Sequence, residues 1–236
     1  MISTIVCGAK GRMGQNILKL LKEDKTFRLA YACDLDSPLQ NGIEKGDVVI
    51  DFSTPEATLK HIELCEKHKK PIVIGTTGFT PEQKKRLEAS AKKIPVILSS
   101  NMSIGVNVLW YLIAQTSQTL GQEFNVSISE THHIHKKDKP SGTAKTMSEV
   151  VEQFRTTRPE IQSIREGEVI GDHTIVFETA RERLEIIHHA KTREIFAEGA
   201  ITAARWILDK KPGLYDMKDV LSLVSSPHVL GGDLKP

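Results

Sequence analysis

The sequence predicts an α/β fold, a Rossmann-like, doubly wound parallel sheet combined with a second, α+β domain. Two observations lead to this fold class. Strand-like and helix-like segments alternate through the first hundred residues, and a glycine-rich turn directly follows the first strand. A third observation marks the second domain, because the alternation stops near residue 104, where a long apolar helix begins. We expect this middle part to be inserted in the first domain or appended to it.

The first hundred residues contain five short apolar runs, as expected for the buried strands of a parallel sheet. Polar segments of helical periodicity separate them, and Pro55 after Ser53 and Thr54 has the pattern of a helix start. The predicted strands are residues 2–7, 28–33, 48–52, 71–74 and 95–98, and the predicted helices are residues 13–21, 55–68 and 80–93.

The rest of the chain has a different pattern. Residues 123–132 alternate, so that Val126, Ile128, Glu130 and His132 share one face of a strand. The other predicted elements are helices at residues 104–120, 142–154 and 193–208 and hairpin-linked strands at residues 169–177 and 184–189. For the Gly- and Pro-rich tail from Pro212 onwards we predict no element.

Composition excludes several classes of protein. Of the 236 residues, 39% are hydrophobic and 26% charged, which indicates a globular protein with a buried core. The net charge of +2 gives no strong basic field for nucleic acid or membrane, and no apolar run is long enough to span a bilayer. Three cysteines without disulfide or metal spacing, and no signal-peptide pattern, predict a cytoplasmic protein.

Gly8, Gly11 and Gly14 follow the first strand. Glycine lets the backbone turn sharply and bring its N–H groups close to a pyrophosphate, and the start of the next helix favours negative charge. The spacing GxxGxxG differs from the usual GxGxxG, so the position directly after a strand is what favours a dinucleotide site. The alternative is a plain strand-to-helix turn.

Asp34 ends the second strand, 20 residues after Gly14. A carboxylate at this place usually accepts hydrogen bonds from the adenosine ribose, and it repels a 2′-phosphate. Lys10 and Arg12 are close in sequence to the glycine turn and would attract such a phosphate. We therefore hypothesise that NADH is used at least as well as NADPH. The alternative for Asp34 is a solvated strand end.

Two polar loops, residues 75–78 and 99–102, follow the fourth and fifth predicted strands. In an open parallel sheet, ligands bind beyond the carboxyl ends of the strands. Both loops are therefore expected to meet the nicotinamide half of the cofactor, unless they are ordinary polar turns.

The run from Glu130 to Thr143 contains three histidines and three lysines before Ser141-Gly142-Thr143. Histidine exchanges protons near neutral pH, lysine supplies fixed positive charge, and hydroxyl and N–H groups at a helix start can bind a carboxylate. This combination predicts a small anionic substrate whose reduction leaves a centre that needs a proton.

Simpler interpretations compete with this one. A metal would need His133 and His135 plus an unseen ligand, because adjacent residues of a strand point to opposite faces, and we expect no metal. The run could also be a solvated loop. Arg193, at the start of the last helix, could be a capping charge or a carboxylate clamp. The pair His188-His189 is interpreted as structural or interfacial.

The chain resembles the dihydrodipicolinate reductases, nicotinamide-dependent enzymes of the diaminopimelate route to lysine. Glu130 to Ala144 is similar to the family signature E-x-H-H-x-x-K-x-D-x-P-S-G-T-A. The resemblance covers nearly the whole chain, which is shorter than many members around residues 35–47. The other similar segments are residues 8–14, 51–53, 75–78, 101–107 and 199–200.

The resemblance implies reduction of 4-hydroxy-tetrahydrodipicolinate, a dicarboxylate, to tetrahydrodipicolinate with NADH and/or NADPH. His132 would be the general acid, with Lys136 as its partner in proton donation and carboxylate binding. The implied substrate-binding residues are His133, Ser141, Gly142, Thr143 and Arg193. The implied cofactor-binding residues are Gly8, Ala9, Lys10, Gly11, Arg12, Met13, Asp34, Gly75, Thr76, Thr77, Ser99, Ser100, Asn101 and Met102. Leu35 departs from members that have Arg at this place, which weakens the expectation of 2′-phosphate binding.

The resemblance also implies a homotetramer assembled through the sheet of the second domain. Residues 1–103 and 194–236 would form the dinucleotide-binding domain, and residues 104–193 the domain for substrate binding and tetramerisation. Two other functions stay open. Another amino- or imino-acid dehydrogenase, such as an aspartate dehydrogenase, would share the glycine turn but not the His/Lys run, and a sensor that binds NAD(H) would show no turnover.

Overall fold

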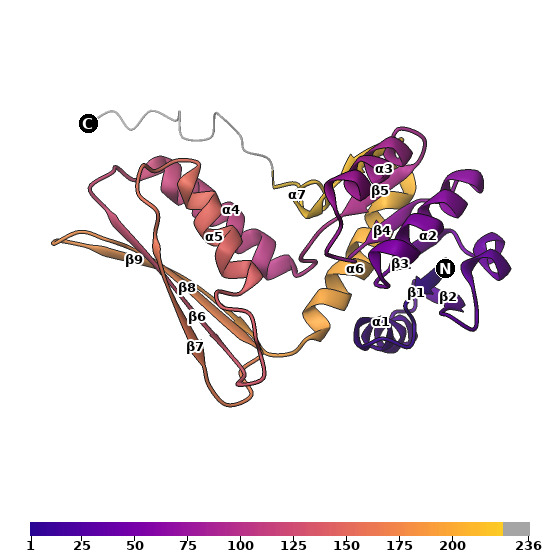
Figure 1. Cartoon of the computed structure of the whole chain (residues 1–236), viewed down its shortest axis with the longest axis horizontal. Coiled ribbons are helices and arrows are strands. Elements are labelled where there is room, and N and C mark those ends of the chain that lie inside the picture. The colour runs from indigo at the N-terminus through magenta and orange to yellow at the C-terminus, as the bar shows by residue number, and fades with distance from the viewer. Residues whose placement is uncertain (224–236) are drawn as a thin grey trace.

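The computed structural model of the chain describes residues 1–223, and it contains two sheets, each covered by helices (Figure 1). The end of the C-terminal tail, residues 224–236, which we predicted as part of the first domain, lies outside the described residues.

The first sheet has six parallel strands in the order β10-β5-β4-β3-β1-β2. The strand order reverses direction between β1 and β3, and such a switch point is where open parallel sheets bind ligands. The strands are β1 (Ile2–Cys7), β2 (Phe27–Cys33), β3 (Val48–Asp51), β4 (Ile72–Ile74), β5 (Pro95–Leu98) and β10 (Gly213–Tyr215).

Helices cover both faces of this sheet, because alternate strand residues point to opposite sides. Val6 and Ile50 pack with α1, α6 and α7, whereas Ile5 and Val49 pack with α2, α3 and two short 3₁₀ turns. This arrangement confirms the predicted doubly wound fold. The helices are α1 (Arg12–Glu23), α2 (Pro55–Lys67), α3 (Pro81–Ala91), α6 (Glu194–Trp206) and α7 (Met217–Val220), and the 3₁₀ turns on this face are η1 (Leu39–Asn41) and η2 (Ile43–Lys45).

The second sheet has four strands in the order β7-β6-β8-β9, in which β6 and β7 are parallel and the other pairs antiparallel. Two helices cover one face of it, as Figure 1 shows, and bury Trp110, Ile113 and Met147 against Ile128 and Phe177. The elements are β6 (Asn125–His132), β7 (Glu160–Arg165), β8 (Gly171–Glu178), β9 (Arg183–Ala190), α4 (Ile104–Thr119) and α5 (Gly142–Glu152).

The structure corrects the predicted elements in four places. Helix α7 lies in the segment from Pro212 onwards, where no element was predicted, because four residues are too few to show a helical period. Strand β7 was not predicted, because its polar, mostly half-exposed residues give no clear period. Strand β10 was not predicted either, since it is a three-residue edge strand that follows Pro212. Strand β8 begins at Gly171 rather than at residue 169, because the Val169 carbonyl accepts a hydrogen bond from the backbone N–H of His133 in the loop. The ends of the other predicted helices and strands differ from the observed ones by a few residues.

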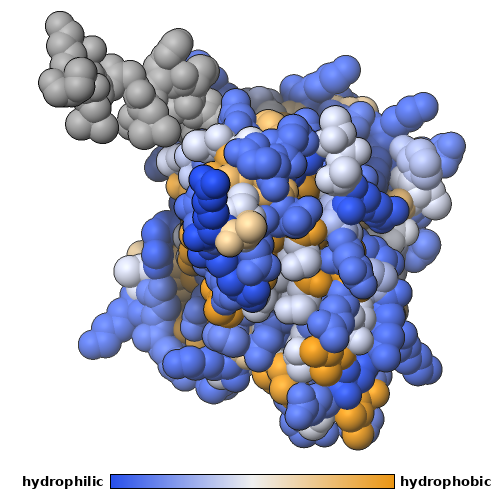
Figure 2. All heavy atoms as spheres, turned by 90° about the vertical axis from the view of Figure 1, so that its left-hand side faces the viewer, coloured by the Kyte–Doolittle hydropathy of each residue, from blue (hydrophilic) through white to orange (hydrophobic). Residues whose placement is uncertain are grey.

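Within residues 1–223, no helix is long and apolar enough to cross a membrane. The side of the molecule formed by the four-stranded sheet carries hydrophilic and apolar side chains in mixture (Figure 2). Among the exposed apolar side chains are Leu184 and Ile187 of β9.

Candidate active site

A cleft of about 910 Å³ lies between the two sheets. All seven residues predicted to act on the substrate line it, although they come from positions 132 to 193 of the chain. They are His132, His133, Lys136, Ser141, Gly142, Thr143 and Arg193. Residues that follow the strands of the first sheet line the same cleft, namely Arg12, Met13, Thr77, Ser100 and Asn101.

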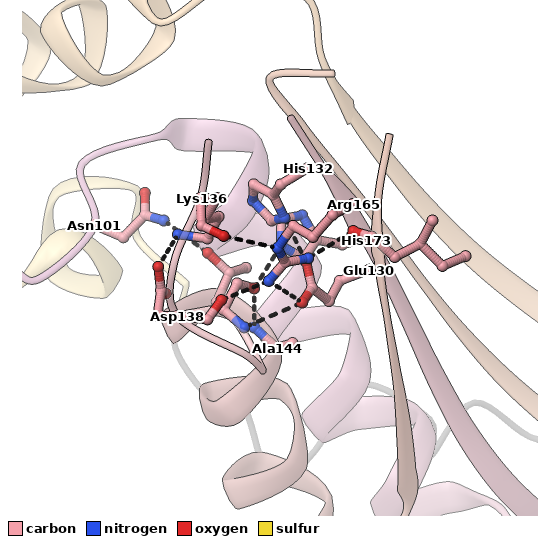
Figure 3. Close-up of polar contacts among 11 residues, drawn as sticks. Asn101, Glu130, His132, Lys136, Asp138, Ala144, Arg165 and His173 are labelled. Carbon is pink, nitrogen blue, oxygen red and sulfur yellow. Dashed lines mark hydrogen bonds and ion pairs between the residues drawn. The ribbon is translucent and has the colours of Figure 1, made fainter. Parts of the chain in front are cut away.

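His132 is oriented by Glu130, two residues before it on the same face of β6. The Nδ1–H of His132 donates a hydrogen bond to Oε2 of the Glu130 carboxylate (Figure 3). This bond assigns the proton of the neutral imidazole to Nδ1, so Nε2 is the atom that can gain or lose a proton toward the cleft. The predicted alternation of β6 is confirmed, because Ile128, Glu130 and His132 are all buried.

Arg165, at the end of β7, fixes Glu130 in turn. Its Nη1 and Nη2 donate to the two carboxylate oxygens over 3.0 and 2.9 Å, and the side chains of both residues are almost fully buried. Burial alone would raise the pKa of Glu130, but the bonds from Arg165, Ser163 and His132 outweigh it and lower that pKa. Glu130 is therefore a fixed anion beneath the imidazole.

The His132 imidazole has a lowered pKa in spite of this anion. Burial is the largest cause, and the positive charges of Lys136 and Arg165 act in the same direction, whereas Glu130 opposes them. Without a substrate, His132 is therefore mainly neutral at pH 7. A dicarboxylate in the cleft would add negative charge and favour the imidazolium.

His173 of β8 packs its ring edge-on against His132, with ring centroids 5.1 Å apart. Burial, and then the neighbouring His132 charge, lower the pKa of His173 to about 4. Its Nε2 lies 3.3 Å from the hydroxyl of Ser141. His173 is thus a neutral side chain that connects His132 to the start of α5.

The start of α5 forms another part of the cleft wall. The Ser141 hydroxyl caps the helix by accepting a hydrogen bond from Ala144 N–H, and the Ser141 N–H donates to Glu130 over 3.3 Å. The first N–H groups of a helix have no acceptor within it, so those of Gly142 and Thr143 are available for a carboxylate. Gly142 has open space around its Cα.

Two cations also line the cleft. The Lys136 ammonium lies 2.9 Å from Asp138, which is part of the same loop (Figure 3). Arg193 precedes α6 and donates a hydrogen bond from Nη2 to Nε2 of His133 over 3.0 Å. Its side chain makes no capping bond to α6. Arg193 thus lines the cleft without capping α6, and its role as a carboxylate clamp stays a prediction.

A second cleft, of about 740 Å³, opens at the carboxyl ends of β1, β2 and β3. Gly8, Lys10, Gly11 and Asp34 line it. The Asp34 carboxylate accepts hydrogen bonds from the N–H groups of Lys10 and Leu35, at 2.8 and 2.9 Å, and these bonds lower its pKa. Asp34 therefore stays ionised next to the glycine turn.

The glycine turn itself fits a dinucleotide. Gly8 has φ of +74°, and a Cβ atom on it would lie 2.4 Å from the Phe52 carbonyl oxygen. A Cβ atom on Gly14 would lie 2.2 Å from the Gly8 carbonyl oxygen, so Gly14 lets α1 start directly against the turn. Glycine is therefore required at both places, and the exposed backbone at the start of α1 can approach a pyrophosphate.

Some of the predicted cofactor residues line neither cleft. Ala9 and Met102 are buried in the core of the first domain, and Thr76 is buried with its hydroxyl 3.1 Å from that of Thr58. The Ser99 hydroxyl donates to the Asn101 carbonyl, and a Cβ atom on Gly75 would meet the Phe52 ring. These residues therefore support the loops through buried packing and internal hydrogen bonds, and they do not face either cleft.

Arg165 and His173 are two residues of the site that were not predicted from the sequence. Their signal is weak, because both belong to strands whose pairing with β6 is decided by the tertiary fold. The sequence offered one hint: Glu130 shares a buried strand face with apolar residues, and a buried carboxylate needs a cation.

Comparison with known proteins decides the family. Residues 2–102 match the family model "Dihydrodipicolinate reductase, N-terminus", and residues 105–221 match "Dihydrodipicolinate reductase, C-terminus". The chain belongs to the dihydrodipicolinate reductase family. A 4-hydroxy-tetrahydrodipicolinate reductase of Geotalea daltonii is 40% identical over 266 aligned residues, which cover 94% of this chain and 100% of that relative. That of Geobacter sulfurreducens is 40% identical over 265 residues, with the same coverage.

Solved structures agree with this fold. The dipicolinate-bound dihydrodipicolinate reductase from Paenisporosarcina sp. TG-14 has a TM-score of 0.81 and 23% identity, covering 93% of this chain and 99% of that one. Aspartate dehydrogenase from Thermotoga maritima has a TM-score of 0.51 and 14% identity, covering 89% and 98% of the two chains. The second likeness extends to the fold alone, so the aspartate dehydrogenase alternative is not favoured.

Proposed function

We propose that the chain catalyses the NAD(P)H-dependent reduction of 4-hydroxy-tetrahydrodipicolinate to tetrahydrodipicolinate. One observation carries this proposal. The imidazole of His132, the Lys136 ammonium and the start of α5 converge on the cleft that also receives Arg12 and Met13 from the glycine turn. A proton donor, carboxylate-binding groups and the dinucleotide turn thus surround a single space.

The glycine turn and Asp34 would hold the adenosine end and the pyrophosphate of the cofactor, and Thr77, Ser100 and Asn101 would lie along its nicotinamide end. The 4-hydroxyl group of the substrate is lost as water, and the bound cofactor would supply a hydride for the same ring carbon. Asn101 is held in place beside the expected nicotinamide end. Its carbonyl accepts a hydrogen bond from Asn107 Nδ2 over 2.9 Å, and its own Nδ2 donates to Thr143 over 3.4 Å. These bonds hold the loop against α4 and the start of α5.

The substrate carries two carboxylates, and the cleft offers positive groups on two sides. Lys136 with the N–H groups of Gly142 and Thr143 would bind one carboxylate, and Arg193 with His133 the other. Charge-assisted hydrogen bonds of this kind are about twice as strong as neutral ones. The relative from Paenisporosarcina is described with dipicolinate bound, and dipicolinate is a dicarboxylate as well.

His132 would deliver the proton that the reduced ring needs. Its Nδ1–H keeps the hydrogen bond to Glu130, and the negative charge of the bound substrate favours a second proton at Nε2. That proton then passes to the carbanion-like or enamine centre, and the imidazole returns to its neutral form. Glu130 and Arg165 keep the ring in one orientation throughout and do not exchange the proton themselves.

The wider organisation follows from the same proposal. Residues 1–103 and 194–236 would form the dinucleotide domain, which agrees with the packing of α6 on the first sheet, and residues 104–193 the substrate domain. The uncovered face of the four-stranded sheet, on which Ile187 of β9 is exposed, would be the surface of a homotetramer. The three free thiols suit a reducing, cytoplasmic environment.

One assay tests the function. NADH oxidation is followed with the freshly generated product of dihydrodipicolinate synthase, and in parallel with oxaloacetate plus ammonia. We expect turnover with the first substrate alone. Turnover with oxaloacetate and ammonia would indicate an amino-acid dehydrogenase, and cofactor binding without turnover on either would indicate a sensor.

A further inference from the structure

A cluster of two thiols and one imidazole lies at the floor of the second cleft, beside the glycine turn. It takes no part in the proposed reduction. Cys7 ends β1, Cys33 ends β2, and His61 comes from α2. Their Sγ and Nε2 atoms all lie within 4.8 Å of one another, and both cysteines are buried. None of the three residues lines the first cleft, which contains His132 and Lys136, so the cluster is separate from that cleft.

We propose that Cys7, Cys33 and His61 form a binding site for a thiophilic divalent cation such as Zn²⁺. The distances fit such an ion. In a tetrahedral zinc site, Zn–S and Zn–N bond lengths imply about 3.6 Å between sulfur and nitrogen ligands and about 3.8 Å between two sulfurs. Cys33 Sγ lies 3.8 Å from His61 Nε2. An ion would thus bind with only small side-chain shifts.

The imidazole of His61 is oriented as in metal sites. Its Nδ1 lies 2.8 Å from the buried carboxylate of Asp51, and this hydrogen bond directs Nε2 toward the two thiols. Asp51 is itself fixed, because it accepts from the N–H and the hydroxyl of Ser53 over 2.9 and 2.6 Å. A carboxylate that holds the far nitrogen of a ligating histidine is a recurrent outer-shell feature of zinc proteins.

The two thiols are held by the sheet. Cys7 and Cys33 are paired neighbours in the parallel register of β1 and β2, so their side chains start from rigid adjacent positions. The thiolate is the form that binds metals, so an ion bound here would displace the thiol protons.

The cleft gives an ion a route to the cluster. Cys33 and His61 line the cleft beside Asp34, whereas Cys7 lies behind them. Three protein ligands leave the fourth position of a tetrahedral ion for water on the cleft side. Sequence spacing could not reveal this site, because its ligands are 26 and 28 residues apart in the chain.

Cobalt is the probe, because thiolate ligands give bound Co²⁺ a strong near-ultraviolet charge-transfer absorption. The reduced full-length protein is titrated with Co²⁺ and then with Zn²⁺. We expect one Co²⁺ per chain with this absorption, which Zn²⁺ displaces. Wild-type protein without the absorption would overturn the proposal, and this result needs no variant.

Variants locate the ligands. Cys33→Ser and His61→Gln should each weaken Co²⁺ binding by more than the ~10- to 100-fold that outer-shell changes cause. His61 is partly exposed, so its variant serves where Cys33→Ser does not fold. Cys65→Ala and His68→Gln, on or just after α2, are matched controls with no expected loss. Retention of the thiolate–cobalt absorption in His61→Gln with unchanged affinity, or its loss in Cys65→Ala, would refute the assignment.

Discussion

Arg165 grips Glu130 through two hydrogen bonds of 3.0 and 2.9 Å, and this pair lies almost fully buried beneath the imidazole of His132. Arg165 and Glu130 are 35 residues apart and meet because β7 pairs in parallel with β6. The pair therefore couples the stability of the second domain to the orientation of the proposed general acid.

Removal of one partner should be costly. Arg165→Met leaves the Glu130 carboxylate buried without a cation, so we expect a loss of about 3–5 kcal/mol in the free energy of unfolding, measured with urea. Arg158→Met is the control, because Arg158 pairs with Glu152 at the exposed end of α5. That change should cost less than about 1 kcal/mol. Equal effects of the two variants would show that the buried pair adds nothing.

His132→Gln should lower kcat by about 100- to 10,000-fold, the usual contribution of a positioned general acid. Cofactor affinity should stay unchanged, because His132 lies outside the second cleft, which contains the glycine turn. Steady-state kinetics and NADH titration measure the two quantities. His68→Gln, just after α2 and outside this cleft, controls for loss of an imidazole. Turnover of His132→Gln close to that of the wild type would contradict the acid role.

Gly171→Ala tests the position of the same ring. A Cβ atom on Gly171, the first residue of β8, would lie 3.0 Å from His132 Nε2, so the imidazole must shift by a few tenths of an ångström. We expect kcat to fall several-fold while KM and the urea midpoint change little. Gly167→Ala, in the preceding turn, is a poor control because its φ is +49°, so Gly142→Ala, which has open space, serves instead for stability. An unchanged kcat in Gly171→Ala would show that the ring tolerates the shift.

His173 should make stability depend on pH. Its pKa is about 4 in the folded chain, against about 6.5 in an unfolded one, so the unfolded chain binds the extra proton first. Stability from this group is complete above pH 6.5 and is lost as the pH falls toward 4. Between pH 7 and pH 5 the loss should reach about 2 kcal/mol.

Urea unfolding at both pH values measures this loss. His132 and His188, whose pKa values burial also lowers, should add to it in the same direction, whereas the charges of Glu130 and Asp172 reduce it. The variant His173→Gln should show a smaller difference in stability between pH 7 and pH 5 than the wild type. Equal slopes in wild type and His173→Gln would mean that His173 already titrates normally.

The choice of cofactor depends on Asp34. Its ionised carboxylate lies in the second cleft, where the adenosine end of the cofactor is expected. Lys10, which would attract a 2′-phosphate, is paired with Asp36 at 2.6 Å. We therefore expect kcat/KM for NADH to equal or exceed that for NADPH. Asp34→Asn should shift the ratio toward NADPH, whereas Asp47→Asn, which contacts the far end of β1, should not. A large NADPH preference in the wild type would reject the hypothesis.

The sequence by itself determined much of this protein. Alternating apolar runs are a local property, so the strands and helices of the first hundred residues could be predicted to within a few residues, whereas the short elements β10 and α7 could not. The glycine turn and the run from Glu130 to Thr143 were equally readable, because each places its groups within one short segment.

Other features were decided only by the tertiary structure. Arg165 and His173 meet His132 through strand pairing, and Cys7, Cys33 and His61 meet through the parallel sheet and the helix that covers it. Residue spacing does not specify which strands become neighbours, since that choice depends on how two sheets and their helices bury their apolar faces together. The same packing fixed the pKa values, because burial and neighbouring charges exist only after the chain has folded.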